Sequence, residues 1–180
     1  MANSNGIDDT LSDLVKGVNQ SSVEEKEKSS AVNCDSYSVL LVEDQVGYLE
    51  LMCEAIAGLL QNITVETANN GEQAWSLLNL DASMTEKPIA YPSLIITDLN
   101  LPRLSGLELL SRIKKDQKLQ AIPIVVFSTS QAESDILSCY QAHANCFITK
   151  PRDLDAFIEV VQSIVTFWLN LVCLPEPFSS

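Results

Sequence analysis

The chain has 180 residues, of which 46% are hydrophobic, so it can bury the core of one domain of ordinary size. Its 24 acidic and 11 basic side chains give a net charge of -13. A surface this acidic repels phosphate backbones and anionic lipid, and no apolar run approaches the roughly 20 residues of a membrane span. Composition therefore argues against binding to nucleic acid or membrane.

The compartment follows from the N-terminus and the cysteines. Residues 1–30 lack the basic start and apolar stretch of a signal peptide. The 5 cysteines are an odd number and include no CxxC pair, which indicates reduced thiols. We therefore expect a cytoplasmic protein.

Residues 1–36 have the polar, acidic composition of a disordered extension. Within them, residues 10–18 carry leucines and valines at helical spacing, but this segment is too short for a stable isolated helix. It is either a fraying helix in a disordered tail or a docking helix for a partner.

From residue 37 to about 172, short apolar runs alternate with amphipathic stretches, and residues 173–180 form a short tail. Residues 81–92, polar and with two prolines, are predicted to be a loop. Five strands are each followed by a helix, which predicts a parallel sheet with helices on both faces, in the flavodoxin-like order 2-1-3-4-5. The predicted strands span 39–42, 63–68, 94–97, 122–127 and 145–148, and the helices 49–59, 72–80, 105–115, 131–141 and 153–171.

Polar side chains follow four of these strands, at the edge where parallel sheets bind ligands. They are Glu43 and Asp44, Asp98, Ser128, and Lys150. Clustered carboxylates suit Mg²⁺ or Mn²⁺, and a lysine with a hydroxyl could hold a phosphoryl group. Asp98 is then placed to act as a nucleophile that forms an aspartyl phosphate. No glycine-rich dinucleotide or P-loop motif is present.

These residues stand in four motifs: Val-Glu-Asp at 42–44, Ile-Thr-Asp-Leu-Asn-Leu-Pro at 96–102 with Gly106, Phe-Ser-Thr at 127–129, and Ile-Thr-Lys-Pro at 148–151. Together, and in this order, they resemble the signature of the CheY-like receiver domain of two-component response regulators. The resemblance covers about 37–172, the whole predicted domain.

The resemblance implies a role for each residue. Asp98 is the phosphoacceptor, Asp44 the direct Mg²⁺ ligand and Glu43 the acid that holds the metal through water. The backbone carbonyl of Asn100 is the third protein ligand. Four further residues complete the implied site: the phosphate-binding Lys150, the switch hydroxyl of Ser128, the coupled aromatic Phe147, and Pro151 at the family's cis-proline position.

Residues 127–130, 145–150, 167–169 and 174–175 are similar to the stand-alone response regulators of cyanobacterial phytochrome histidine kinases. This implies a phosphoprotein and not an enzyme: it takes a phosphoryl group from a sensor histidine kinase, of phytochrome type, and signals through its own surface. The alternative is a phosphorelay shuttle that passes the phosphoryl group to a histidine phosphotransfer protein. A dehalogenase-like phosphatase is disfavoured, because it needs a second aspartate where Asn100 stands.

The predicted last helix, 153–171, is apolar on two sides. One stripe should face the sheet: Leu154, Phe157, Ile158, Val161, Val165 and Trp168. The second is Val160, Ile164, Phe167 and Leu171. Either its end folds back on the domain, or it forms the interface of a homodimer, which is also what the resemblance implies.

Overall fold

The computed structural model describes residues 37–60, 62–79 and 91–175. The extension predicted over 1–36, its segment 10–18 and most of the predicted loop 81–92 lie outside these residues. So does the end of the predicted tail, from residue 176.

The described residues form a five-stranded parallel sheet of order β2-β1-β3-β4-β5, as the sequence predicts. The strand order reverses beside β1, which pairs with β2 on one side and β3 on the other. β4 starts later than predicted, because Pro123 has no N–H to donate, although its carbonyl still accepts from Ile95 at 3.0 Å. The strands are β1 (Tyr37–Val42), β2 (Ile63–Ala68), β3 (Leu94–Thr97), β4 (Ile124–Ser128) and β5 (Cys146–Thr149).

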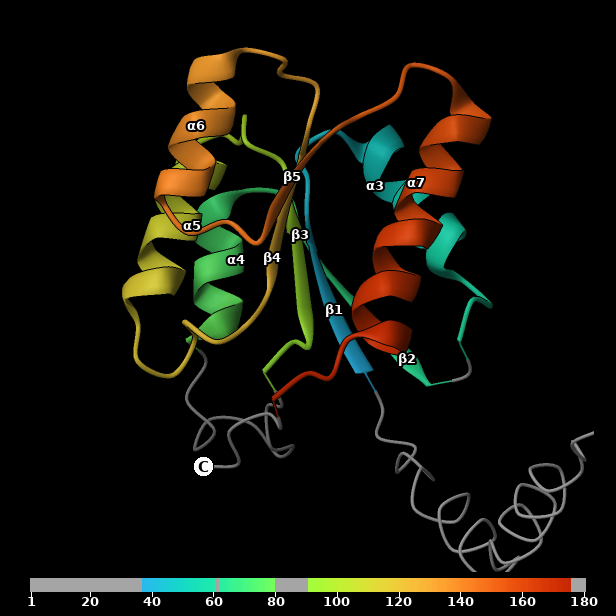
Figure 1. Ribbon diagram of the computed structural model, residues 1–180, viewed down its shortest axis with the longest axis horizontal. Coiled ribbons are helices and arrows are strands. Elements are labelled where there is room, and N and C mark those ends of the chain that lie inside the picture. Colours follow the sequence, from blue (N-terminus) through green and yellow to red (C-terminus); the bar gives the residue numbers. More distant parts are fainter. Residues whose placement is uncertain (1–36, 61, 80–90, 176–180) are drawn as a thin grey trace, which may run out of the picture. The chain divides into compact units, whose positions relative to one another are not determined.

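Helices cover both faces of the sheet (Figure 1). One face carries α4 (Gly71–Leu78), α5 (Gly106–Lys115) and α6 (Glu133–Gln141), and the other carries α3 (Val46–Ile56) and α7 (Leu154–Thr166). Predicted caps are present: Ser105 and Glu108 form a capping box at α5, and Asp153 accepts from the Ala156 N–H at 3.0 Å. In the described residues each strand is followed by a helix, as in the predicted flavodoxin-like fold.

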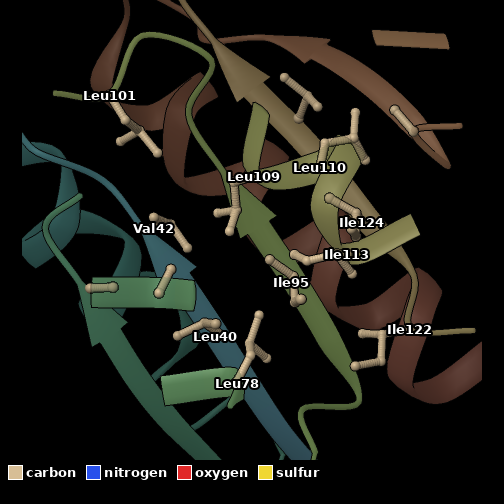
Figure 2. Close-up of a cluster of buried hydrophobic side chains, with 14 of the residues drawn as sticks. Leu40, Val42, Leu78, Ile95, Leu101, Leu109, Leu110, Ile113, Ile122 and Ile124 are labelled. Carbon is tan, nitrogen blue, oxygen red and sulfur yellow. The ribbon is translucent and has the colours of Figure 1, made fainter. Parts of the chain in front are cut away.

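Each strand supplies both layers of the core, because successive side chains point to opposite faces. Along β1, Leu40 and Val42 join the cluster under α4, α5 and α6, which Figure 2 shows, while Val39 and Leu41 join the cluster under α3 and α7. The four residues of β3 and the five of β4 are all buried, which explains why these strands read as continuous apolar runs. The sheet is therefore a rigid platform for the residues at its edge.

In the predicted last helix, two residues lie on the side opposite to the one predicted. Leu154 is 52% exposed and does not face the sheet, whereas Ile164, assigned to the outer stripe, is 5% exposed. After α7 the chain widens into a π-helical turn, η2 (Phe167–Leu171), in which the Val172 N–H donates to the Phe167 carbonyl at 3.1 Å. This register buries Leu169 and leaves Phe167 and Leu171 exposed.

By length and composition, one helical stretch within the described residues, Leu154–Leu171, is apolar enough to cross a membrane, with a mean hydropathy of 1.3. Its inner side chains, however, pack on the sheet among the cluster of β1, β3 and β4 residues: Phe157, Val161, Ile164, Val165 and Leu169. Burial against the sheet accounts for these inner residues, which are 28% of the stretch, because a core helix needs an apolar face. It does not account for the exposed Phe167 and Leu171.

Candidate functional site

The predicted site residues meet at the carboxyl edge of the sheet because backbone hydrogen bonds continue past the strand ends. The Asp98 N–H donates to the Val42 carbonyl at 2.9 Å, which fixes the end of β3 beside the end of β1. The Lys150 N–H donates to the Ser128 carbonyl at 2.8 Å and fixes the end of β5 beside β4. Four separate strands thus deliver their polar residues to one place.

Three carboxylates form the centre of this edge. Glu43, Asp44 and Asp98 each offer an oxygen, and these atoms lie within 4.8 Å of one another. Glu43 is 1% exposed and Asp98 3%, whereas Asp44 lies open to solvent. An open cluster of hard oxygen ligands fits a divalent cation such as Mg²⁺ or Mn²⁺.

Lys150 is the cation that the protein itself places in the cluster. Its side chain is 0% exposed, and its Nζ donates to Glu43 Oε2 at 2.5 Å and to Asp98 Oδ2 at 3.2 Å. One ammonium offsets one of the three negative charges. The site therefore keeps a net negative charge, which a divalent cation would balance. The donor set therefore fits the predicted metal.

Burial raises the pKa of the Glu43 carboxyl, although its hydrogen bond to Lys150 acts in the opposite direction. The neighbouring charge of Asp98 raises this pKa further, and the N–H of Gln45 lowers it. A bound divalent cation would reverse the balance, because it favours the ionised form. Glu43 is thus held by the fold in a position where its negative charge needs a cation.

Local structure holds the Asp98 carboxylate in place. Its Oδ1 accepts from the Leu99 N–H at 2.6 Å, while Oδ2 faces Lys150. The backbone is fixed as well, because the first turn of α5 packs directly against it: a Cβ built on Gly106 would lie 1.9 Å from the Asp98 carbonyl oxygen. Only glycine permits this approach.

Gly106→Ala is therefore expected to lower the free energy of unfolding by about 3 kcal/mol, since the backbone of the Asp98 loop would have to move. Urea unfolding followed by circular dichroism measures this. Gly47→Ala is the matched control: it also lies in the first turn of a helix but meets nothing within 4 Å, and it should stabilise by about 0.5 kcal/mol. Equal stability of the Gly106→Ala and wild-type proteins would contradict the close packing.

In the described part of the chain, the side chains of the other predicted residues make no hydrogen bond to the three carboxylates or to the Lys150 ammonium. Ser128 is fully buried, and its Oγ accepts from the Ser130 N–H at 3.4 Å. Phe147 is half-buried against the cluster under α4, α5 and α6. Asn100 lies exposed in the loop after β3. The bond before Pro151 is trans, not cis as the resemblance implies; no cis bond occurs in the described ranges.

One residue at this edge, Tyr48, was not predicted from the sequence. Its ring lies in the first turns of α3, and the Lys150 Nζ sits over the ring, 4.5 Å from the centroid. A signal was present in the sequence, because an aromatic residue so soon after the Glu43-Asp44 pair must lie near the same sheet edge. The contact itself could not be predicted from this spacing, however, because it depends on where Lys150 lies relative to α3.

The sheet order, the acidic cluster and the buried lysine at the carboxyl edge agree with what the resemblance to receiver domains implies. The family model of the response regulator receiver domain matches residues 39–162, and the chain belongs to this family. Members of the family act in two-component signalling and are not enzymes in the usual sense. This confirms the family predicted from the four motifs.

Three matches indicate which members of the family this chain resembles. The chain is 36% identical over 137 residues to "Response regulator Rcp1" of Synechocystis sp., a match that covers 76% of this chain and 92% of that protein. The crystal structure of the phosphorylated cyanobacterial phytochrome response regulator RcpA matches with a TM-score of 0.74 and 37% identity, over 79% of this chain and 100% of that one. The Mn²⁺-bound form of Rcp1 matches with a TM-score of 0.71 and 36% identity, over 77% and 99%. The predicted similarity to phytochrome response regulators is thus confirmed.

Proposed function

We propose that this protein is a response regulator that accepts a phosphoryl group on Asp98 from a sensor histidine kinase of phytochrome type. The observation that carries the proposal is the position of the Asp98 carboxylate, which lies 3.2 Å from the buried Lys150 ammonium and within 4.8 Å of two other carboxylates. The likeness to phytochrome response regulators supports the choice of kinase.

In the transfer step, a carboxylate oxygen of Asp98 forms a bond to phosphorus while the bond from phosphorus to the kinase histidine nitrogen breaks. The nitrogen leaves with the electron pair of that bond. Lys150 offsets the negative charge of the phosphoryl oxygens as they approach Asp98. The burial of Asp98 limits access of water to the resulting acyl phosphate.

Mg²⁺ or Mn²⁺ would be held by Asp44 and Asp98 directly, by Glu43 through water and by the backbone carbonyl of Asn100. When bound, the cation neutralises the carboxylates and the incoming phosphoryl oxygens. Because Asp44 is exposed to solvent, a cation could reach the cluster from the side on which Asp44 lies.

The readout would begin at Ser128 and Phe147. We expect the Ser128 hydroxyl to turn toward the phosphoryl group and give up its contact with the Ser130 N–H. Phe147 would then turn inward, which changes the surface of β4 and β5. A packing change of this kind has two discrete states, because close-packed cores do not deform continuously.

The experiment that tests the proposal is phosphorylation of the chain by a phytochrome-type kinase, or by acetyl phosphate, with Mg²⁺. The label should be stable in acid and lost in base, as expected of an acyl phosphate. Addition of a histidine phosphotransfer protein separates this role from the shuttle: a shuttle passes the label on, whereas a terminal regulator retains it. Absence of label under all these conditions would reject the proposal.

We place this function in a receiver domain over residues 37–172 of a cytoplasmic protein. The net charge of -13 supports a protein partner in preference to nucleic acid or a membrane surface. Signalling would then pass through the surface of the receiver itself.

The proposed output surface is a homodimer interface on α7 and η2. Phe167 is 51% exposed and Leu171 72%, and Phe167 with Trp168 borders an apolar hollow of about 620 Å³ next to β5. A second copy of this chain would cover these side chains, each of which contributes roughly 1.5–3 kcal/mol when fully buried. The negative charge opposes association, but at physiological salt the repulsion is screened beyond about 8 Å.

Phe167→Glu is therefore expected to weaken dimerisation by about 1,000-fold, because a twofold dimer loses this anchor from both copies, at about 2 kcal/mol each. Sedimentation velocity, with and without phosphorylation, measures the effect. Leu154→Glu is the control: it is equally exposed at the opposite end of the helical stretch and should leave the dimer intact. A wild-type protein that sediments as a monomer in both states would reject the interface.

A further inference from the structure

The Lys150 ammonium has more neighbours than its two carboxylates. The side chain is 0% exposed, so the remaining side of the ammonium faces protein atoms. The Tyr48 ring lies there, its centroid 4.5 Å from Nζ, and the Phe127 ring follows at 5.9 Å. Both distances fall within the roughly 6 Å over which the face of an aromatic ring attracts a cation.

The Tyr48 ring is itself held in position. It stacks on the Phe157 ring of α7, with centroids 5.4 Å apart and an interplanar angle of 21°. Phe157 is 2% exposed and packs in turn on Phe127, at 5.2 Å. Phe127 and Phe157 belong to the core cluster under α3 and α7, and Tyr48, which is half-buried, packs against it. Moving the Tyr48 ring away from Lys150 would therefore cost the stacking contact with Phe157.

Two carboxylates compete for Lys150. Its contact with Glu43, at 2.5 Å, is shorter than the contact with Asp98, at 3.2 Å. If Lys150 is to interact with Asp98, its ammonium must not bind to Glu43 alone. The ring face attracts the ammonium without a fixed hydrogen-bond direction, so the attraction persists while the ammonium moves between the two oxygens.

We propose that Tyr48 is a positioning residue: its ring face seats the Lys150 ammonium within reach of Asp98 and of a phosphoryl group bound there. The proposal rests on the proposed phosphorylation of Asp98 and adds a residue to that site. The ring performs this role and the phenol hydroxyl does not, so phenylalanine should substitute for tyrosine.

The first test needs no phosphorylation. In a protein with ¹³C-labelled lysine, protons on the Lys150 ε-carbon should show an upfield NMR shift, because they lie near the ring face of Tyr48. The shift should remain in Tyr48→Phe and be lost in Tyr48→Leu, with assignment by Lys150→Arg. A Lys150 signal that is identical in wild type and Tyr48→Leu would overturn the seat.

The second test is the rate of labelling by acetyl phosphate with Mg²⁺. Tyr48→Leu should be about tenfold slower, a loss between those expected for an exposed and for a desolvated cation–π contact, because Tyr48 is half-buried, and Tyr48→Phe should restore the wild-type rate. Tyr37→Leu is the matched control, since it removes a half-buried ring from the same cluster at the other end of β1 and should leave the rate unchanged. If Tyr48→Leu does not fold, Tyr48→Met replaces it.

The outcomes separate the two proposals. A wild type that takes no label, with the ring-dependent shift of Lys150 intact, rejects the phosphorylation site and keeps the seat. A wild type that is labelled, with Tyr48→Phe as slow as Tyr48→Leu, rejects the role of the ring face. Equal rates for Tyr48→Leu and wild type also reject it.

Discussion

Asp98→Asn is expected to abolish incorporation of phosphate, because an amide is not nucleophilic enough to form an acyl phosphate. Asparagine has nearly the same shape, and its oxygen can still accept from the Leu99 N–H that now bonds to Asp98 Oδ1. The variant should therefore fold. Labelling with radioactive acetyl phosphate, with acid-stable counts read after gel separation, measures the effect.

Asp155→Asn is the control for this experiment, since it removes an exposed aspartate in the first turn of α7 and should be labelled like the wild type. Thermal melting of both variants verifies that the fold is retained. Full labelling of Asp98→Asn would mean that another residue is the acceptor, and the proposed site would be wrong.

The second large effect concerns the metal. Asp44→Ala should weaken Mg²⁺ binding by about 100-fold, because it removes both a direct ligand and a charge. The loss of a partner that acts through water typically lowers metal affinity by about 10–100-fold. Glu43→Gln should accordingly cost about tenfold. It preserves the shape of the side chain and an oxygen that can still accept from Lys150 Nζ, so the buried lysine keeps a partner. Calorimetric titration of Mg²⁺ measures both affinities.

Glu50→Ala provides the control, because Glu50 is an exposed acid on α3, the helix that follows the cluster. It should bind Mg²⁺ as tightly as the wild type, which excludes a general effect of lost negative charge. If Asp44→Ala and wild type give the same titration, the metal does not bind at this cluster.

The sheet and its order could be predicted from the sequence because the signals are local. The side chains of β3, from Leu94 to Thr97, read as a buried strand without knowledge of their neighbours, since both faces of a parallel strand are covered. The order 2-1-3-4-5 then follows from right-handed crossovers between such strands. Capping at Ser105 was equally readable, because a capping box needs only two residues three apart.

The last helical stretch shows where local pattern is not enough. Ile164 and Phe167 occupy one stripe of an ideal helix, yet the structure buries the first and exposes the second. The π-helical turn of η2 changes the angular spacing at this point, and the sheet and α3 occupy one side of α7. Which apolar residue faces solvent therefore depends on packing partners that are remote in sequence.

The fold class and the family could be predicted from the sequence. So could the position of the candidate site, because strand ends converge in any parallel sheet and the residue types at those ends suit a metal and a phosphoryl group. Which of these charged groups contact one another is visible in the tertiary structure alone. Lys150 lies between Glu43, 107 residues away in the chain, and Asp98, 52 residues away. Its contact with Tyr48 arises because α3 and α7 pack side by side on one face of the sheet, where Phe157 supports the ring. Attraction between such groups depends on distance in space and on burial, and neither can be read from the order of residues.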